Sequence, residues 1–436
     1  MDLTVKKITK WLLVFLAIFI PLREVIALYT VSYIKFIPDI LVYLLLALVV
    51  IKNKFKLNLK IYDILYLLFL VFGLITSLLN STSLVAYALQ VRSITTMYLL
   101  FYILRNVKLD IKDYKPFVIA LFSTLALITS IAIIEYVSNK TLCFPLEWAE
   151  SITYRSNFAR TYSLLNNPNI FASFLFFSIF LAYFMENNKF IKIPKVLYLL
   201  AFIGIFISVS RSVLLVLIGF FIYILINSII NKNIKDFIIK IILVVIAFLI
   251  SFGLNIIKNK VIDYLDKKST DVTIKIPDSS DDEKVTILDR WKEFENGKTL
   301  DNSKTDGRVY RIKLGFEIFK DNKVYGTGFG TFGSAASKMV TPDLYADYDI
   351  EPGFYSDNEY IKIVVETGII GTVLYSLFII SLLVSFINNH YKLVMMLSFL
   401  FLGLFFNIFE VQVICMIVFI SLSIFELKKS ELKWKN

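Results

Sequence analysis

The sequence predicts an all-α protein that crosses a membrane about twelve times, with one large loop outside the membrane between the ninth and tenth crossings. Apolar residues make up 57% of the 436-residue chain, above the roughly 45–50% of soluble domains. Its mean hydropathy is +0.72. These residues are gathered in runs near the 20 or so residues that a helix needs to cross the hydrocarbon core. The short loops between runs alternate between basic and non-basic composition.

Twelve apolar runs qualify as crossings, each bounded by polar or charged residues. The seventh run is short, and the last two form a tight hairpin. In chain order the expected spans are 11–29, 36–51, 61–79, 84–104, 117–137, 169–186, 196–209, 212–230, 236–257, 359–386, 392–409 and 411–427.

Basic residues predict the orientation of these spans. Lysines precede the first span, and lysine or arginine follows every even-numbered span. The positive-inside rule then places both ends of the chain in the cytoplasm. The first span lacks a clear small-residue cleavage site, so we expect it to be retained as an anchor. The net charge of +11 is therefore a topology signal, and the expected partner is the lipid bilayer, with no nucleic acid.

The same topology divides the chain into three parts. Residues 1–257 hold spans one to nine with an outer loop at 138–168, residues 258–358 form an outer loop domain, and residues 359–436 hold the last three spans. About half of the chain's acidic residues lie in the segment 258–358. We expect this segment to fold over the membrane face.

Within the outer loop domain, residues 281–297 and 307–322 show the apolar spacing of helices. The glycine-rich stretch "YGTGFGTFG", residues 325–333, follows the second of them. Because this stretch follows a helix instead of a strand, it does not predict a dinucleotide site. We expect a tight loop in which backbone packs closely.

The sequence argues against several kinds of site. Its only histidine, His390, is expected in a cytoplasmic turn, so neither a histidine metal cluster nor a Ser-His-Asp triad can form. Cys143 lies in a polar loop and Cys415 in a span, so we expect no disulfide. We expect neither a metal nor a cofactor.

Charges inside or at the edge of a span cost roughly 2.5–3.5 kcal/mol each on insertion scales, so they are functional candidates. Arg92 lies within the span sequence "YALQVRSITTMYLL". It either contacts substrate or forms an ion pair in the membrane, with Glu366 as the candidate partner. Arg211 lies in the outer turn of "FISVSRSVLLVLIG". It either extends to the interface or grips phosphate oxygens with its planar guanidinium.

Arg308 and Arg311 lie three residues apart in "DGRVYRIKLGFEIF". On a helix both side chains project from one face near its N-terminus. Two guanidinium groups beside the free N–H groups of a helix start would bind a diphosphate. The alternative is a solvated face shared with Glu317 and Lys320.

Arg160 precedes "NNPN", where Asn167 can cap the sixth span and Pro168 suits its first turn. We expect Arg160 to contact the ligand.

The stretch "GFYSDNEYIKIVVETGIIG", residues 353–371, begins the tenth span. Ser356 with Glu359 fits a capping box, which satisfies the free N–H groups of a helix start. Asp357 is either part of that helix start or a carboxylate that handles a proton during a reaction.

Four motifs in this order resemble the O-antigen ligase and Wzy-type polysaccharide polymerase superfamily. They are Arg160 through "NPNIFA", then "SRSVLL", then "GRVYRIKLGFEIFKDNKVYGTGFGTF" in the outer loop, and then "DNEYIKIVVETGIIG". The order, span number and loop position agree over most of the chain. The resemblance implies a metal-independent glycosyltransferase of the bacterial cytoplasmic membrane. Its active site would face outward and use glycans linked to undecaprenyl pyrophosphate.

The resemblance also implies roles for single residues. Arg211 and Arg308 would contact the donor pyrophosphate, and Asp357 stands where ligases of the superfamily have a histidine, directly before the motif N-x-[YF]. This departure favours a polymerase. The aromatic residue usual four positions after the loop arginine is Ile312 here. With Asp357, Arg308 and Arg211 as the catalytic set, the expected substrate contacts are Arg160, Arg311, Arg92, Asn358 and Tyr360.

The expected function is a polysaccharide polymerase of capsule, exopolysaccharide or O-antigen synthesis, which joins one lipid-linked repeat unit to another. A ligase that moves glycan to a lipid or wall acceptor is the alternative within the superfamily. A lipid-glycan flippase or transporter is the alternative from another class, although such carriers usually show internal symmetry and a central connection. Expected partners are the lipid-linked donor and acceptor oligosaccharides, with a chain-length regulator and a flippase beside them.

Overall fold

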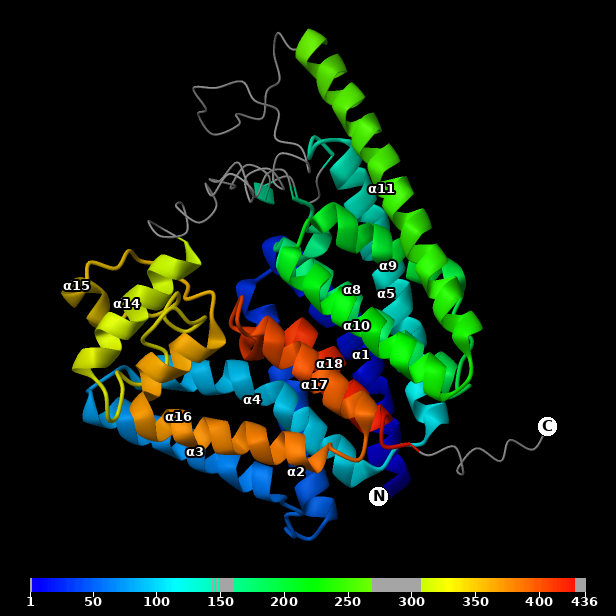
Figure 1. Cartoon of the computed structure of the whole chain (residues 1–436). Helices are drawn as coiled ribbons and strands as arrows, with labels where there is room; N and C mark the ends of the chain where they lie inside the picture. Colours follow the sequence, from blue (N-terminus) through cyan, green and yellow to red (C-terminus); the bar gives the residue numbers. More distant parts are fainter. Residues whose placement is uncertain (1, 143–144, 146, 149–159, 269–306, 428–436) are drawn as a thin grey trace. The chain divides into compact units, whose positions relative to one another are not determined.

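The computed structural model describes residues 2–142, 145, 147–148, 160–268 and 307–427. Helices dominate these ranges, which contain no strand (Figure 1). Nine of the helices in this part of the chain are long and apolar enough to cross a membrane, and three shorter apolar helices account for the other predicted spans. The prediction of an all-α, multi-pass membrane protein is confirmed.

The elements follow one another in this order: α1 (Asp2–Leu28), η1 (Ser32–Phe36), α2 (Ile37–Lys52), α3 (Ile61–Leu79), α4 (Leu84–Val107), α5 (Ile111–Val137), η2 (Ser163–Leu165), α8 (Pro168–Asn187), α9 (Lys195–Ser208), α10 (Arg211–Ile230), α11 (Ile234–Lys268), α14 (Arg308–Asp321), α15 (Leu344–Asp347), α16 (Glu359–Ser385), α17 (His390–Leu402), η3 (Ile408–Glu410) and α18 (Gln412–Ile424).

Most predicted spans agree with these helices to within a few residues. Helix α1 departs at its start, because it begins at Asp2 and not at the predicted residue 11. Helix α11 continues past the predicted end at 257 as far as Lys268. The predicted span 392–409 is too long, because α17 ends at Leu402 and only the short η3 follows. In the turn after α17, Asn407 and Glu410 are buried and hydrogen-bond to Gly333 and Ala335 of the segment 307–358.

Two compact units make up the described chain, and each joins segments that lie far apart in the sequence. Among the described residues, unit 1 takes 2–9, 39–109 and 307–427, and unit 2 takes the remainder. In unit 1, α16 packs along α3, α18 packs on α4, and α14 packs on α16 (Figure 1). In unit 2, α9 packs against α5, α8 and α11.

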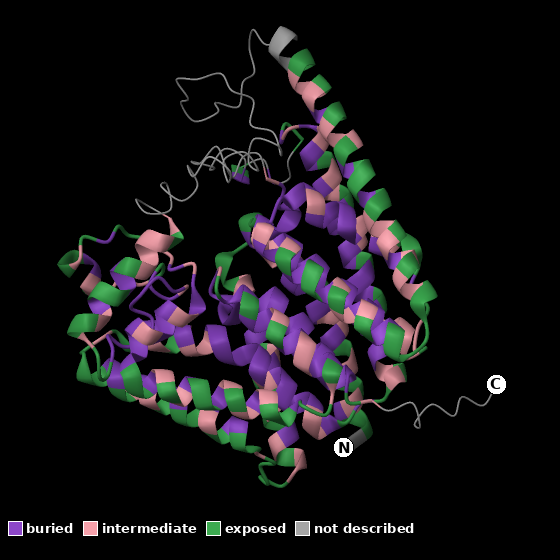
Figure 2. Ribbon diagram, viewed as in Figure 1, coloured by how far each residue is buried: buried purple, intermediate pink, exposed green. Residues whose placement is uncertain are grey.

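Each unit buries many aromatic and aliphatic side chains, and other apolar side chains are exposed on its surface. Exposed residues recur along α11 and α16, as Figure 2 shows. On α11 many of them are apolar, for example Ile242, Phe248 and Leu249. Large exposed apolar surfaces mark interaction with apolar partners, and helices this long fit contact with lipid chains.

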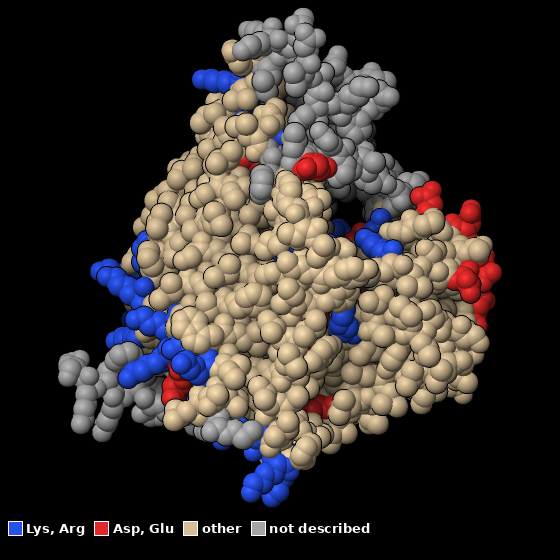
Figure 3. Space-filling view, turned by 180° about the vertical axis from the view of Figure 1, so that it is seen from behind, with Lys and Arg blue, Asp and Glu red and all other residues tan. Residues whose placement is uncertain are grey.

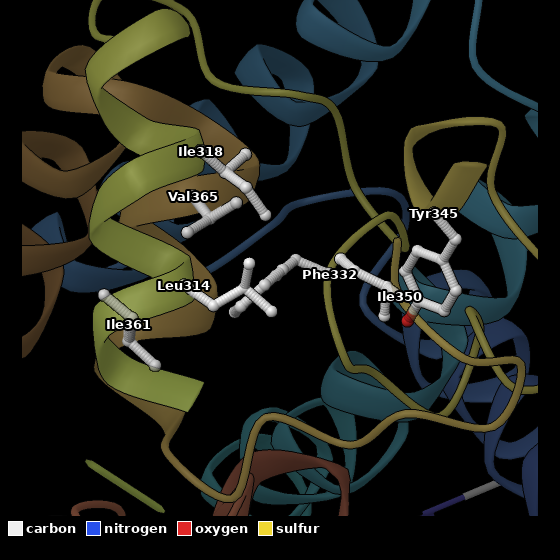
Figure 4. Close-up of a cluster of buried hydrophobic side chains, with 7 residues drawn as sticks. All are labelled: Leu314, Ile318, Phe332, Tyr345, Ile350, Ile361 and Val365. Carbon is white, nitrogen blue, oxygen red and sulfur yellow. The ribbon is translucent and has the colours of Figure 1, made fainter. Parts of the chain in front are cut away.

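The segment 307–358 of unit 1 is fixed to α16 by a small core of its own (Figure 4). Leu314 and Ile318 of α14 pack with Ile361 and Val365 of α16 and with Phe332, and Tyr345 and Ile350 complete the cluster. Glycine at 315 lets the helices approach, since a Cβ there would lie 2.5 Å from Ile361 Cγ1. The helix predicted over 307–322 is confirmed as α14, and the one predicted over 281–297 lies outside the described residues.

Candidate functional site

The glycine-rich stretch forms a tight loop beside a break in α16. Gly326, Gly328, Gly330 and Gly333 all have positive φ, and α16 is non-helical at Gly368 (φ 60°, ψ −162°). A Cβ on Gly326 would lie 2.4 Å from the backbone nitrogen of Thr367. The predicted close packing of backbone is therefore confirmed.

The loop satisfies the backbone groups that the break in α16 exposes. The N–H groups of Thr327 and Gly328 donate to the carbonyls of Val365 and Glu366 at 3.0 and 2.9 Å. In return, the N–H of Ile369 donates to the carbonyl of Lys323 at 2.8 Å. Irregular backbone at membrane depth is tolerated only where protein supplies such partners, so the loop and the broken helix form one structural unit.

The side chain of Glu366 binds the glycine loop. The ion pair expected between Arg92 and Glu366 is therefore wrong. Glu366 Oε1 accepts hydrogen bonds from the N–H groups of Gly330 and Phe332, both at 3.1 Å. Arg92 forms the expected intramembrane ion pair, but with Asp39 at 2.9 Å and not with Glu366. This ion pair gives Arg92 a structural role, and its contact with substrate stays a prediction.

A buried charge network lies at the start of α16. Lys362 Nζ lies 2.9 Å from Glu359 Oε1 and 2.7 Å from Glu410 Oε1. Gln90 Nε2 donates to Glu410 Oε1, and the N–H of Ala335 donates to its Oε2, at 2.9 and 2.8 Å. Sequence reasoning missed this network. Its signal was the i, i+3 and i+7 spacing of Glu359, Lys362 and Glu366, which places three charges on one helix face.

The helix start of α16 differs from the expected capping box. The N-cap is Asn358, whose side chain accepts hydrogen bonds from the N–H groups of Tyr360 and Ile361, both at 3.0 Å. Ser356 lies two residues before the N-cap and instead donates to Asn407 Oδ1 at 2.8 Å. The Ser356 and Glu359 capping box was therefore wrong, and Asp357 does not cap the helix either.

Asp357 instead faces the first turn of α14. Its carboxylate forms an ion pair with Arg311, so Arg311 does not lie on a solvated face with Glu317 and Lys320. Asp357 has a left-handed φ of 51°, and its side chain is 31% exposed. The ion pair leaves the carboxylate partly open to solvent.

Two further cations of unit 1 belong to segments next to this ion pair in the chain or in space, Arg308 on the helix turn of Arg311 and Lys338 within the electrostatic influence of Asp357. Arg308 begins α14, and its guanidinium carbon lies 5.6 Å from the ring centre of Phe405. Lys338, which the sequence analysis missed, lies 4.3 Å from the ring centre of Tyr355. Burial lowers the pKa of Lys338, and the nearby negative charges of Asp357 and Glu410 partly oppose that effect. No sequence pattern distinguishes Lys338 from other lysines.

Unit 2 contains a separate cluster around the start of α10. Arg160 donates to the carbonyl of Ser208 at 3.2 Å and to Asn169 Oδ1 at 2.6 Å. Ser210, which precedes Arg211, donates to the same Asn169 oxygen at 2.9 Å. The structure thus brings Arg160 to the turn that carries Arg211. Asn167 caps α8 and Pro168 follows it, as predicted.

The predicted site residues therefore fall into groups. Arg308, Arg311 and Asp357 gather in unit 1, and Arg160 and Arg211 gather in unit 2. Two others have hydrogen-bond partners within the protein: Asn358 caps α16 and donates to the carbonyl of Leu404, and Tyr360 donates its hydroxyl to the carbonyl of Leu400 at 2.6 Å. Their contact with substrate stays a prediction.

Comparison with known proteins supports the resemblance seen in the motifs. A family model described as O-antigen ligase matches residues 196–376. The matched segment includes Arg211, Arg308, Arg311, Asp357 and the glycine loop. No curated protein matches the chain. The match over residues 196–376 supports the O-antigen ligase and Wzy-type superfamily expected from the sequence.

Proposed function

We propose that the protein is a polysaccharide polymerase of the bacterial cytoplasmic membrane. It transfers a glycan from undecaprenyl pyrophosphate to a lipid-linked repeat unit at the outer face of the cytoplasmic membrane. Both ends of the chain lie in the cytoplasm. The family match supports a glycosyltransferase-type enzyme that acts on lipid-linked polysaccharide. The choice of polymerase rests on Asp357, which replaces the histidine that ligases of this superfamily carry.

The observation that carries the proposal is the placement of the Asp357 carboxylate. Asn358 performs the capping, so the helix start leaves Asp357 available. Arg311 holds the carboxylate from the first turn of α14, and Arg308 lies on that same turn. A base and an anion-binding group therefore lie on adjacent segments of one compact unit.

In the proposed reaction, a hydroxyl oxygen of the acceptor sugar attacks the anomeric carbon of the donor glycan. The bond between this carbon and the pyrophosphate oxygen breaks, and undecaprenyl pyrophosphate departs with the bonding electrons. Asp357 accepts the proton of the attacking hydroxyl. Arg308 stabilises the negative charge that develops on the leaving phosphate. The step needs no nucleotide and no metal, since pyrophosphate is already an activated leaving group.

The proposal for unit 2 is separate. Arg211, positioned beside Arg160, binds phosphate oxygens, since guanidinium groups form bidentate hydrogen bonds with them. A ligase remains the second candidate, because the matching family model is described as O-antigen ligase. The two candidates differ in the acceptor and not in the donor chemistry.

The deciding experiment supplies the purified full chain, in lipid nanodiscs, with a lipid-linked repeat unit as donor and acceptor. A polymerase produces a ladder of products that differ by one repeat. A single transfer to a different lipid or wall acceptor, without a ladder, supports the ligase. The absence of any glycan transfer contradicts both candidates.

In the same assay, Arg308→Ala should lower the rate by about 100-fold or more, as removal of a charge-stabilising donor does elsewhere. Arg308→Lys should restore only part of it, because lysine lacks the planar fork. Lys313→Ala, which removes an exposed cation from the same helix, is the matched control and should be near normal. Normal transfer by Arg308→Ala at equal abundance contradicts the role of Arg308.

A further inference from the structure

Unit 1 contains a polar pocket that the proposed reaction does not use. It measures about 410 Å³ and lies between the α3–α4 turn, the glycine loop and the segment that leads into α15. This volume falls within the roughly 300–1,000 Å³ of small-molecule sites. Its lining is rich in hydroxyl, amide and carboxylate groups, including Asn80, Thr82, Thr331, Asp343 and Asp347.

The side-chain donors of Asn80, Thr82 and Thr331 in this lining are committed within the protein. Asn80 Nδ2 donates to the carbonyls of Thr76 and Gly326 at 2.8 and 3.0 Å. Thr82 donates to the carbonyl of Ser77 at 3.0 Å, and Thr331 donates to that of Gly328 at 2.6 Å. These three side chains therefore offer a ligand acceptor oxygens, as the carboxylates of Asp343 and Asp347 do.

The charge of the pocket also favours a ligand that donates hydrogen bonds. Asp343 and Asp347 line it, whereas none of the described lining residues is lysine or arginine. Acidic side chains also gather along the edge of the molecule that carries α14 and α15, on the right in Figure 3. Such a pocket repels phosphate. It suits a ligand with many hydroxyl donors, since carboxylates and amide oxygens accept hydrogen bonds from them.

The glycine loop connects this pocket to the helix start of α16. Gly330 and Thr331 line the pocket. Gly333, three residues after Gly330, accepts a hydrogen bond at its carbonyl from Ser356 N–H at 3.0 Å. Ser356 directly precedes Asp357. We propose that the pocket lined by Asn80, Asp343 and Asp347 is a saccharide subsite that binds an uncharged, hydroxyl-rich sugar of the acceptor glycan. This assignment rests on the proposed function.

The test uses the full chain in detergent and two kinds of probe. The first is the repeat-unit oligosaccharide released from the surface polysaccharide of the source strain, without lipid or pyrophosphate. The second is undecaprenyl pyrophosphate without glycan. Binding is measured by saturation-transfer NMR for the oligosaccharide and by thermal shift for the lipid. The variant is Asp343→Asn with Asp347→Asn, which keeps side-chain size and removes both charges.

The variant should bind the oligosaccharide about tenfold more weakly or worse, because two charge-assisted hydrogen bonds are lost. Binding of undecaprenyl pyrophosphate should not change. In the transfer assay, KM for the acceptor should rise by a similar factor while kcat stays within about twofold. Asp349→Asn is the matched control, since Asp349 is exposed, lies outside the pocket lining and has a left-handed φ that asparagine tolerates.

Failure of this inference is distinguishable from failure of the proposed function. Weaker oligosaccharide binding by the variant, in a protein that shows no transfer, keeps the subsite and contradicts the polymerase. Transfer with unchanged KM and unchanged oligosaccharide binding overturns the subsite. A separate thermal-shift control adds calcium alone. Calcium binding to the wild type that the variant loses, without oligosaccharide binding, also overturns the subsite and makes the pocket a cation site.

Discussion

Helices α8 and α16, one in each compact unit, begin with the same backbone geometry. Asn166 and Asp357 each have a left-handed φ, of 50° and 51°. The next residue in each case is an asparagine in extended conformation that accepts hydrogen bonds from the N–H groups two and three residues later. The two starts differ in the left-handed residue, which is neutral in α8 and acidic in α16.

This difference separates capping from chemistry. The polar cluster before α16 is a helix start, as the one before α8 is, but the start does not require an acid. Asparagine adopts the left-handed conformation readily, as it does at position 166. The acid at position 357 instead forms an ion pair with Arg311. The comparison therefore favours a role for the Asp357 carboxylate beyond the helix start.

The largest expected effect comes from making the two starts alike. Asp357→Asn places before the N-cap of α16 the same residue, asparagine, that α8 has at position 166. The thermal unfolding midpoint should therefore stay within a few degrees of wild type. Glycan transfer should fall by about 10²–10⁴-fold, the usual contribution of a positioned base, since the amide cannot accept a proton at neutral pH. Transfer rate at matched protein abundance is the measurement.

The reverse exchange provides the control. Asn166→Asp introduces an acid at the same geometry in α8, and transfer should stay near normal. If Asp357→Asn makes long polymer at the wild-type rate, Asp357 handles no proton and the two helix starts are equivalent.

The two helices also differ along their length. Helix α8 is continuous, and 89% of its most apolar 18-residue stretch is buried. Helix α16 is broken at Gly368 and carries three buried charges, Glu359, Lys362 and Glu366. The break is stable because the glycine loop replaces the missing helical hydrogen bonds. A regular buried helix depends on side-chain packing, whereas a broken one depends on a particular partner loop.

The second prediction tests this dependence. Gly326→Ala should destabilise the protein by at least about 1–3 kcal/mol from its positive φ alone, and the new Cβ would also meet Thr367 N at 2.4 Å. We expect a lower unfolding temperature and lower abundance. The control is Gly219→Ala in α10, where a Cβ would meet nothing within 4 Å. Equal stability of the two variants would contradict the proposed dependence of α16 on the loop.

The sequence predicted the parts of this fold that follow from local composition. Apolar runs identified the twelve helices, and residues 307–322 showed the spacing of α14. The Asn167 cap was predicted because Pro168 marks the first helical turn. The glycine loop was predicted as a tight turn, although its partner, the break at Gly368, was not.

Polar partners that are distant in the sequence could not be predicted, because the sequence alone does not distinguish one candidate partner from another. Arg92 pairs with Asp39, which lies 53 positions away in the sequence. Ser356 fits the capping-box pattern as well as a true cap would, and only the backbone conformation shows that Asn358 is the N-cap. The pairing of Arg311 with Asp357 joins residues 46 positions apart. Local patterns define elements, and tertiary packing selects among their polar partners.

The smallest expected effects come from removing the two asparagine caps. Asn358→Ala and Asn167→Ala each remove a side-chain acceptor for two free N–H groups, which should cost about 0.5–2 kcal/mol of stability. If neither side chain contacts substrate, transfer should fall no further than the folded fraction does. Asn358 also donates to the carbonyl of Leu404 at 3.1 Å, so its variant should be the less stable of the two. Thermal unfolding and transfer rate per folded molecule are the measurements. A drop in rate per folded molecule in Asn358→Ala alone would show that this side chain also contacts substrate, and would place the chemistry of α16 on two adjacent residues.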